Sequence, residues 1–436
     1  MDFDLPVFPP GFYWGASTAG HQVEGGNQDQ WTIWELAHAK ELAKNAAHKY
    51  PMISREYTIS RLPIWQEAKD QIQDPNNYVS GTGVDHYRRF KHDFDLLEDL
   101  NLNAYRFSIE WSRLEPEEGK WDEEAFNHYR EYIKELRSRK IEPFVNIWHT
   151  TLPTWFSDKG AFEKHANLLY WKRFIKKITD ELLDEVKYVI TINEPNVYAT
   201  YSYLTGEYPP NKKDALQYSL VYWHLTRAHR AAYKIIKNKY PDIQIGIASQ
   251  LANIQAKRPH NLLDEIITKW MRYFWNWWFF RRTRKEQDFI GFNYYFTDYY
   301  RFDKGIRPTD PKVPLSDLGW YMEPEGIYPL LLRIWARYKK PIFITENGIA
   351  DSKDQYRRWW IEETIVAMER AISEGVDLRG YFHWSLLDNF EWAYGWWPKF
   401  GLVEVDREHG MRRKIRPSAR WFASRIKQLS LGSKKQ

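Results

Sequence analysis

The chain has 436 residues, 43% of them hydrophobic, and carries a net charge of +5 at pH 7. This length can bury a large core, and so mild a charge, without a long basic run, argues against a nucleic-acid-binding tail. The absence of cysteine excludes disulfides and thiolate metal sites. No basic segment followed by an apolar one opens the chain, and no apolar run reaches the roughly 18 residues of a membrane span. We therefore expect a soluble, cytoplasmic protein.

Short apolar runs rich in β-branched and aromatic residues alternate with helix-like stretches along the chain. The pattern predicts strands at 12–17, 103–109, 143–148, 187–193, 243–249, 288–293, 341–346 and 378–384. It predicts amphipathic helices at 122–139, 168–183, 214–239, 326–338 and 354–374. Such alternation is typical of parallel βαβ units, and eight strands favour an α/β fold with a single (β/α)8 TIM barrel spanning residues 1–436 as one domain. The largest loop insertion, at about 27–84, is expected on the face where barrels carry their active sites.

The segment 270–285 is unusually aromatic and ends in a basic cluster that includes Arg281, Arg282 and Lys285. As one helix it would be apolar on nearly all sides, which indicates either burial or contact with lipid. It is about half as long as a membrane span. Packing as an outer barrel helix is the first interpretation. Peripheral contact with an anionic membrane through 270–285 is the alternative.

Two glutamates stand at the ends of predicted strands. Glu194 follows the apolar run that begins at Tyr188, and Glu346 follows the run that begins at Pro341. Parallel barrels carry their catalytic groups at the carboxyl ends of strands. Two such carboxylates suit the hydrolysis of a sugar bond, which needs one acid and one nucleophile or base. Either motif alone is weak, because a strand-end glutamate can simply cap a helix.

Several motifs agree in their order along the chain. They are Phe12–Gly25, Tyr105–Trp111, Trp148-His149, Asn193-Glu194-Pro195, Gly291–Tyr295, Thr345–Gly348 and Trp384–Trp392. Together they resemble the retaining β-glycosidases of glycoside hydrolase family 1, in an archaeal-like form. That family includes β-glucosidases, β-galactosidases and β-mannosidases. The resemblance extends from about residue 8 to about residue 425.

The resemblance implies a role for each matching residue. Glu194 would be the general acid and base, and Glu346 the nucleophile that forms a covalent glycosyl-enzyme. Residues implied to bind the sugar are Gln22, His149, Asn193, Trp384, Glu391 and Trp392. Arg106, Asn293 and Tyr295 would lie beside the nucleophile, where Tyr295 also faces the substrate, and Trp320 would form the aromatic wall of the leaving-group site.

Physical chemistry supports this division of roles. Arg106 offers a positive charge that would keep a neighbouring carboxylate ionised, whereas a negative neighbour would raise the pKa of Glu194. A retaining pair requires carboxyl groups about 5–5.5 Å apart, and an inverting pair about 6.5–9.5 Å. We expect the short separation. His149 and Arg106 could instead be satisfied core groups, and Trp111 and Trp320 could either stack on sugar or fill the core.

Two departures from the family bear on the substrate. Many relatives have His-Trp where this chain reads His149-Thr150, so a small polar residue replaces a large aromatic one and predicts a wider or different pocket. Members that act on phosphorylated sugars have serine and basic residues where this chain has Glu391 and Trp392. A carboxylate at that place would repel a 6-phosphate, so we expect unphosphorylated sugars.

The predicted function is a retaining exo-β-glycosidase that hydrolyses terminal β-D-glycosides, with β-glucosides first. Its partners would be small carbohydrates or alkyl and aryl glycosides, with no nucleic acid. No metal-ligand spacing or phosphate-binding glycine loop predicts a cofactor. The alternatives are a transglycosidase of the same chemistry and a non-catalytic sugar- or membrane-binding barrel. Glucose, galactose, mannose and fucose differ in single hydroxyl orientations or substituents, so the choice among them stays open.

Overall fold

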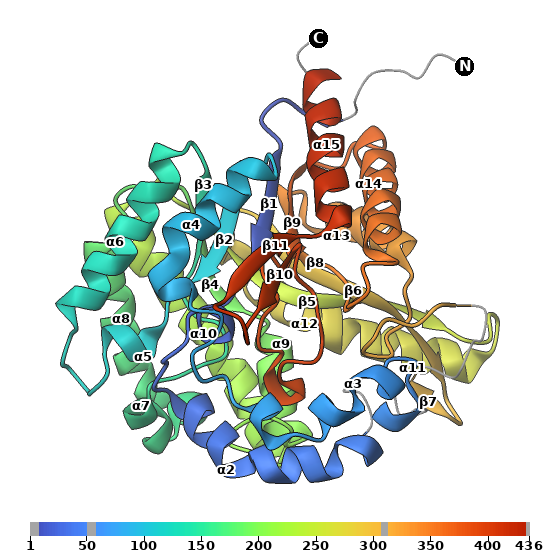
Figure 1. Ribbon diagram of the computed structural model, residues 1–436, viewed down its shortest axis with the longest axis horizontal. Coiled ribbons are helices and arrows are strands. Elements are labelled where there is room, and N and C mark those ends of the chain that lie inside the picture. The colour runs from blue at the N-terminus through green and yellow to red at the C-terminus, as the bar shows by residue number, and fades with distance from the viewer. Residues whose placement is uncertain (1–7, 50–57, 307–312, 433–436) are drawn as a thin grey trace.

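The computed structural model describes residues 8–49, 58–306 and 313–432. Eight parallel strands form its centre: β1 (Tyr13–Ser17), β2 (Ala104–Ser108), β3 (Glu142–Asn146), β4 (Tyr188–Asn193), β5 (Gln244–Ala256), β6 (Ile290–Arg301), β8 (Ile342–Asn347) and β9 (Leu378–Trp384). They are hydrogen-bonded in the order β5-β4-β3-β2-β1-β9-β8-β6, and pairing between β5 and β6 closes the sheet. The predicted (β/α)8 barrel is therefore confirmed (Figure 1).

A helix follows each strand and covers the outside of the barrel (Figure 1). These helices are α4 (His86–Asp99), α6 (Glu123–Ser138), α8 (Leu168–Glu181), α10 (Ala215–Lys239), α11 (Leu262–Arg272) with α12 (Trp278–Arg282), α13 (Ile327–Tyr338), α14 (Arg357–Ser373) and α15 (Pro417–Gly432). Helix α6 shows why they form where they do. Asp122 accepts the backbone N–H of Ala125 at 3.0 Å and caps the helix. Phe126, Tyr129 and Ile133 recur at helical spacing and bury one face.

Aromatic side chains fill the interior of the barrel near the amino ends of its strands. The rings of Phe144 and Tyr188 stack at 4.3 Å, and Phe343 and Phe382 pack edge-on against Phe144 at 5.2 and 4.6 Å. All four are buried. Because this end of the barrel is packed solid, a ligand can enter only from the opposite end, where the loops that follow the strands lie.

Helix α1 (Gly20–Val23) follows β1, and the predicted insertion at 27–84 contains α2 (Gln30–Asn45) and α3 (Trp65–Ile72). Figure 1 shows α2 and α3 along one end of the molecule and α15 at the other. Residues 50–57 of the insertion lie outside the described residues. Residues 1–7 do so as well, and the expectation that the chain opens without a leader segment concerns them. The insertion therefore covers the loop end of the barrel, as its place after a strand predicts.

The segment 270–285 is not the single helix expected from its sequence. Helix α11 runs into a π-helical turn at Tyr273–Trp277, then α12 and a short 3-10 helix at Arg284–Glu286. The π-turn shifts successive side chains to different faces, so Trp277, Phe279 and Phe280 are buried in the core. Trp270 and Phe274 stay 58% and 43% exposed. Within the described part of the chain, no helix is both long and apolar enough to cross a membrane.

The remaining elements are short. Helices α5 (Trp111–Leu114), α7 (Thr154–Asp158) and α9 (Pro195–Ala199) belong to the loops that follow β2, β3 and β4. Strand β7 (Gly305–Ile306) pairs with β6, and β10 (Val403–Asp406) pairs with β11 (Arg412–Ile415) as a separate hairpin. Strands β5 and β6 run to Ala256 and Arg301, well beyond the predicted ends at 249 and 293. This long parallel extension contributes side chains above the barrel mouth.

Candidate active site

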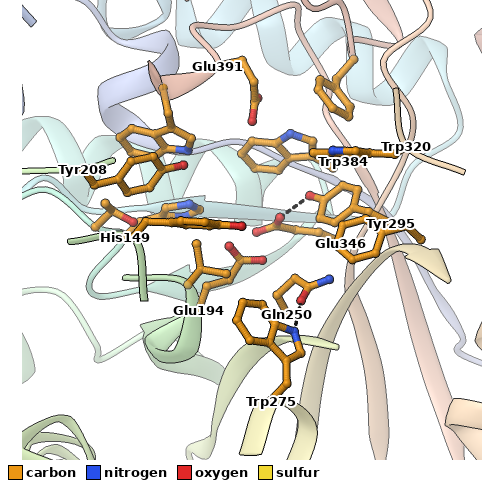
Figure 2. Close-up of a pocket in the computed structure, with 16 residues that line it drawn as sticks. His149, Glu194, Tyr208, Gln250, Trp275, Tyr295, Trp320, Glu346, Trp384 and Glu391 are labelled. Atoms are coloured by element: carbon orange, nitrogen blue, oxygen red, sulfur yellow. Dashed lines mark hydrogen bonds between the residues drawn. The ribbon is translucent and has the colours of Figure 1, made fainter. Parts of the chain in front are cut away.

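Both strand-end glutamates lie in one cavity at the loop end of the barrel. Glu346 is the fifth residue of β8, and Glu194 directly follows β4. Glu194 has a left-handed backbone (φ 46°), which is uncommon for a residue other than glycine and turns its side chain away from the regular course of the strand. Figure 2 shows the two carboxylates directed into the same space. Two acidic groups from different strands therefore face a common site.

The surroundings of Glu346 balance its charge. The buried guanidinium of Arg106, from β2, donates a hydrogen bond to Glu346 Oε1 and forms an ion pair with it. The hydroxyl of Tyr295, from β6, donates to Glu346 Oε2 at 2.5 Å (Figure 2). Both carboxylate oxygens are thus held by donors, and the side chain is fixed in direction.

The surroundings of Glu194 favour its protonated form. Burial and the negative charge of Glu346 raise the pKa of Glu194 from 4.5 to about 8. A hydrogen bond from Asn293 Nδ2 to Glu194 at 2.8 Å acts in the other direction and lowers this pKa. A carboxyl group with this pKa holds its proton at neutral pH. The two glutamates therefore have opposite environments within one cavity, which is the arrangement that acid catalysis beside a nucleophile requires.

Asparagines link the two sides of this pair. Asn193 Oδ1 accepts from Arg106 at 2.6 Å and from Asn293 at 3.2 Å, which fixes the amide so that its Nδ2 faces His149 Nε2 at 3.0 Å. Burial and the charge of Arg106 hold the pKa of His149 well below its usual range, so the ring is neutral and can accept this bond. The network makes Asn193 a bridge between the charged pair and the cavity wall.

Four of the sugar-binding candidates line the cavity: His149, Trp384, Glu391 and Trp392. Burial and the charge of Glu346 raise the pKa of Glu391 to about 8. Gln22 lies behind them, fully buried, and its Nε2 donates to the carbonyl of Phe390 at 2.7 Å. Its Oε1 has no hydrogen-bond partner among the described residues. A buried acceptor without a donor is costly, so this oxygen is suited to receive a ligand hydroxyl.

Tyr295 and Trp320 also line the cavity, whereas Arg106, Asn193 and Asn293 lie beneath its surface. Trp320 packs against Tyr295 and Phe400, with ring centroids 5.6 and 6.0 Å apart, so it serves the core and the cavity together. Its buried Nε1 has no partner among the described residues. Trp111, the other tryptophan of uncertain role, does not line the cavity and stacks on Phe174 at 4.3 Å within the core.

Part of the cavity wall was not predicted from the sequence. Gln250 and Trp275 line the cavity on the side of the two carboxylates that is opposite Glu391, and Trp275 Nε1 donates to Gln250 Oε1 (Figure 2). Gln250 lies beyond the predicted end of its strand, and Trp275 is one of several adjacent aromatics. Thr150, which stands where many relatives have tryptophan, lines the cavity. The other unpredicted wall residues are Val197, Tyr201, Tyr208, Phe296 and Phe400.

Among the residues that the structure describes, no cluster of three or more histidines and carboxylates is suited to hold a metal ion.

Comparison with known proteins covers almost the entire chain. A sequence model described as Glycosyl hydrolase family 1 matches residues 6–286 and 280–430. Beta-glucosidase A of Thermotoga maritima is 30% identical over 97% of this chain and 98% of its own length. The structure of a beta-glycosidase from Pyrococcus horikoshii has a TM-score of 0.83 at 33% identity, over 98% of this chain and 96% of that chain. The structure of a beta-glucosidase from Thermotoga maritima in complex with glucoimidazole has a TM-score of 0.80 at 28% identity, over 97% of this chain and 99% of that chain.

Proposed function

The chain belongs to glycosyl hydrolase family 1, which confirms the resemblance drawn from its motifs, and on this premise we propose that it is a retaining exo-β-glycosidase acting on terminal β-glucosides. The glycosidase class follows from the family. The observation that carries the finer proposal is the pair Glu194 and Glu346, which share a cavity but differ in environment. A non-catalytic barrel would have no need to keep either the pair or this difference.

In the first step, Glu346 attacks the anomeric carbon while Glu194 gives its proton to the departing glycosidic oxygen. The products are a glycosyl ester on Glu346 and a free alcohol or sugar. Esterification removes the negative charge that raises the pKa of Glu194, so Glu194 can stay ionised and act as a base. It then takes a proton from water, whose oxygen attacks the anomeric carbon and releases Glu346. Two inversions leave the original β configuration.

The cavity wall supports recognition of a single terminal sugar. Gln22, His149, Asn193 and Glu391 would hold its hydroxyls, while Trp384 and Trp392 would lie against its ring. The unpartnered Gln22 Oε1 is one acceptor available for a hydroxyl. Glu391 would repel a 6-phosphate in its ionised form, which predominates above its raised pKa of about 8.

Aromatic residues of the cavity wall support an aromatic or sugar leaving group. Trp275, Phe296, Trp320 and Phe400 line the cavity, and Thr150 leaves room where many relatives have tryptophan. Such a wall also favours capture of the glycosyl-enzyme by an alcohol acceptor, which would make the protein a transglycosidase. The ratio of transfer product to free glucose at rising acceptor concentration separates the two activities.

The stereochemistry of the first product tests the mechanism. Proton NMR of fresh hydrolysate from an aryl β-glucoside should show β-glucose before α-glucose, and the reverse order would exclude a retaining mechanism. Glu346→Gln should abolish turnover. Glu117→Gln, which changes an exposed carboxylate outside the cavity, should leave it unchanged. Initial rates on aryl β-glucosides, galactosides, mannosides and fucosides would rank the sugars.

We further propose that the protein is cytoplasmic and forms one catalytic domain over 1–436. Peripheral contact with anionic membranes through 270–285 remains the alternative to packing of that segment against the barrel. Exposed Trp270 and Phe274, with exposed Arg281 and Lys285 nearby in sequence, support the membrane contact. The buried Trp277 limits how much of the segment can take part. Retention of the protein on anionic but not neutral liposomes at low salt would support the membrane contact, and no retention on anionic liposomes would refute it.

A further inference from the structure

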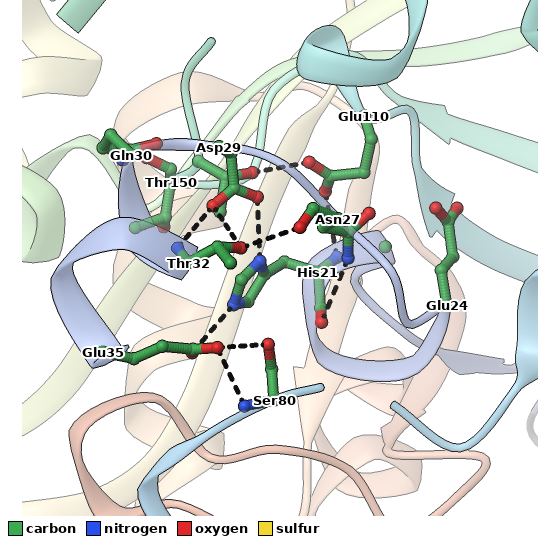
Figure 3. Close-up of polar contacts among 12 residues, drawn as sticks. His21, Glu24, Asn27, Asp29, Gln30, Thr32, Glu35, Ser80, Glu110 and Thr150 are labelled. Atoms are coloured by element: carbon green, nitrogen blue, oxygen red, sulfur yellow. Dashed lines mark hydrogen bonds and ion pairs between the residues drawn. The ribbon is translucent and has the colours of Figure 1, made fainter. Parts of the chain in front are cut away.

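Figure 3 shows a buried charged cluster whose members are not among the residues that line the cavity. His21, from α1, is fully buried, and its Nδ1 is 2.8 Å from Asp29 Oδ2. On the other side of the ring, Nε2 is 3.5 Å from Glu35 Oε2. Both carboxylates are also fully buried. We call His21, Asp29 and Glu35 the His21 clamp.

The histidine of this clamp carries a positive charge. The ring forms a hydrogen bond to Asp29 through Nδ1, whereas Nε2 lies within ion-pair distance of Glu35 and makes no hydrogen bond to it. Although burial opposes the charge, Asp29 and Glu35 raise the pKa of His21 to about 10. The ring is therefore an imidazolium at neutral pH, and its orientation is set from two sides.

The His21 clamp holds its ring against a wall of the cavity. The rings of His21 and Trp392 are parallel, with centroids 5.7 Å apart and an interplanar angle of 4°. A cation near the face of an indole is attracted to it. Trp31 packs edge-on against Trp392 at 4.7 Å from another direction. Trp392 is thus supported from outside the cavity that it lines.

Trp392 needs such support because its backbone is strained. Its φ is +48°, in the left-handed region that bulky residues rarely adopt. Conformations of this kind cost about 1–3 kcal/mol and persist only where the surroundings enforce them. Contacts that fix the indole in place, such as those with the His21 ring and Trp31, help to hold the backbone of Trp392 in this conformation.

The carboxylates of the His21 clamp are themselves anchored. Asp29 caps α2 by accepting the backbone N–H of Thr32 at 2.8 Å. Glu35 accepts the N–H and the hydroxyl of Ser80 at 2.9 and 2.6 Å. The clamp thus connects the insertion at 27–84 to Trp392, although none of the described residues of that insertion lines the cavity.

We propose that His21 is a positioning residue for the sugar pocket, which acts by holding Trp392 in place with the support of Asp29 and Glu35. The proposal rests on the proposed function, in which Trp392 contacts the sugar. Under this proposal, residues of the insertion at 27–84 influence catalysis through their support of Trp392, without contacting the substrate. His21 itself does not touch substrate.

The test compares two buried histidine–aspartate pairs in the same chain. His86 is 1% exposed and its Nδ1 lies 2.8 Å from Asp93, but it does not line or adjoin the cavity wall. Both His21→Gln and His86→Gln should lower the melting temperature. Only His21→Gln should lower kcat/KM for an aryl β-glucoside, by about tenfold, which corresponds to losing one positioning interaction. Equal kinetics for the two folded variants would overturn the proposal.

A double-mutant cycle identifies the residue through which His21 acts. Trp392→Phe should lower kcat/KM, and adding His21→Gln should cause little further loss, because the two changes remove the same arrangement. Additive losses would show that His21 does not act through Trp392. If His21→Gln fails to fold, Glu35→Gln removes one side of the clamp and should show the same pattern more weakly; unchanged kinetics there would equally refute the proposal. A wild-type protein without turnover would instead count against the proposed function.

Discussion

The coupling between Glu194 and Glu346 can be measured directly. Replacing Glu346 by glutamine removes a charge but keeps the size and shape of the side chain. Two unit charges about 5 Å apart, the separation expected for a retaining pair, repel each other by about 3 kcal/mol at an effective dielectric constant of about 20. That energy corresponds to about two pKa units. We therefore expect the pKa of Glu194 to fall from about 8 to about 6 in the variant.

The assay is carbon-13 NMR of the labelled glutamate carboxyls across a pH titration, with Glu194→Gln used to assign the resonance. Glu391→Gln is the matched control, because Glu391 is a smaller contributor to the pKa of Glu194 than Glu346 is. It should lower that pKa by less. A pKa that stays near 8 in Glu346→Gln would show that burial alone sets it, and the switch from acid to base would lose its physical basis.

Three further predictions concern stability and the cavity wall. Between pH 4.5 and about 8, folded Glu194 keeps a proton that the unfolded chain releases, so the stability of the wild type falls as pH rises through this window. The melting temperature of Glu194→Gln should therefore rise relative to that of the wild type from about pH 5 to about pH 8, and a difference in melting temperature that does not change with pH would refute the raised pKa. Tyr295→Phe removes the hydroxyl that holds Glu346 and should lower kcat by about tenfold or more in steady-state assays; an unchanged kcat would show that this bond is not used. Trp275→Ala should raise KM about tenfold for aryl glucosides but less for methyl glucoside, and equal changes would place Trp275 away from the leaving group.

The sequence indicated much of the fold because the relevant signals are local. Runs such as Tyr188–Asn193 are apolar, rich in β-branched residues and followed closely by proline, so each strand could be recognised without knowledge of its neighbours. Glu194 and Glu346 could be recognised for the same reason, since each directly follows or ends such a run. The extensions of β5 and β6 were missed because their residues pair mainly with each other, and pairing is not visible in a single segment.

The sequence by itself determined the eight-strand barrel pattern, the two glutamates and the set of motifs that identifies the family. Tertiary structure alone decided that Trp275 joins the predicted tryptophans in the cavity wall, that it contacts Gln250, and that His21 lies between two carboxylates beside Trp392. Strand and helix patterns arise from neighbours a few residues apart, whereas most of these contacts join residues that are more distant in sequence, up to His21 and Trp392 at opposite ends of the chain. Charge states depend on the same distant contacts, because burial and opposing charges exist only once the barrel has closed.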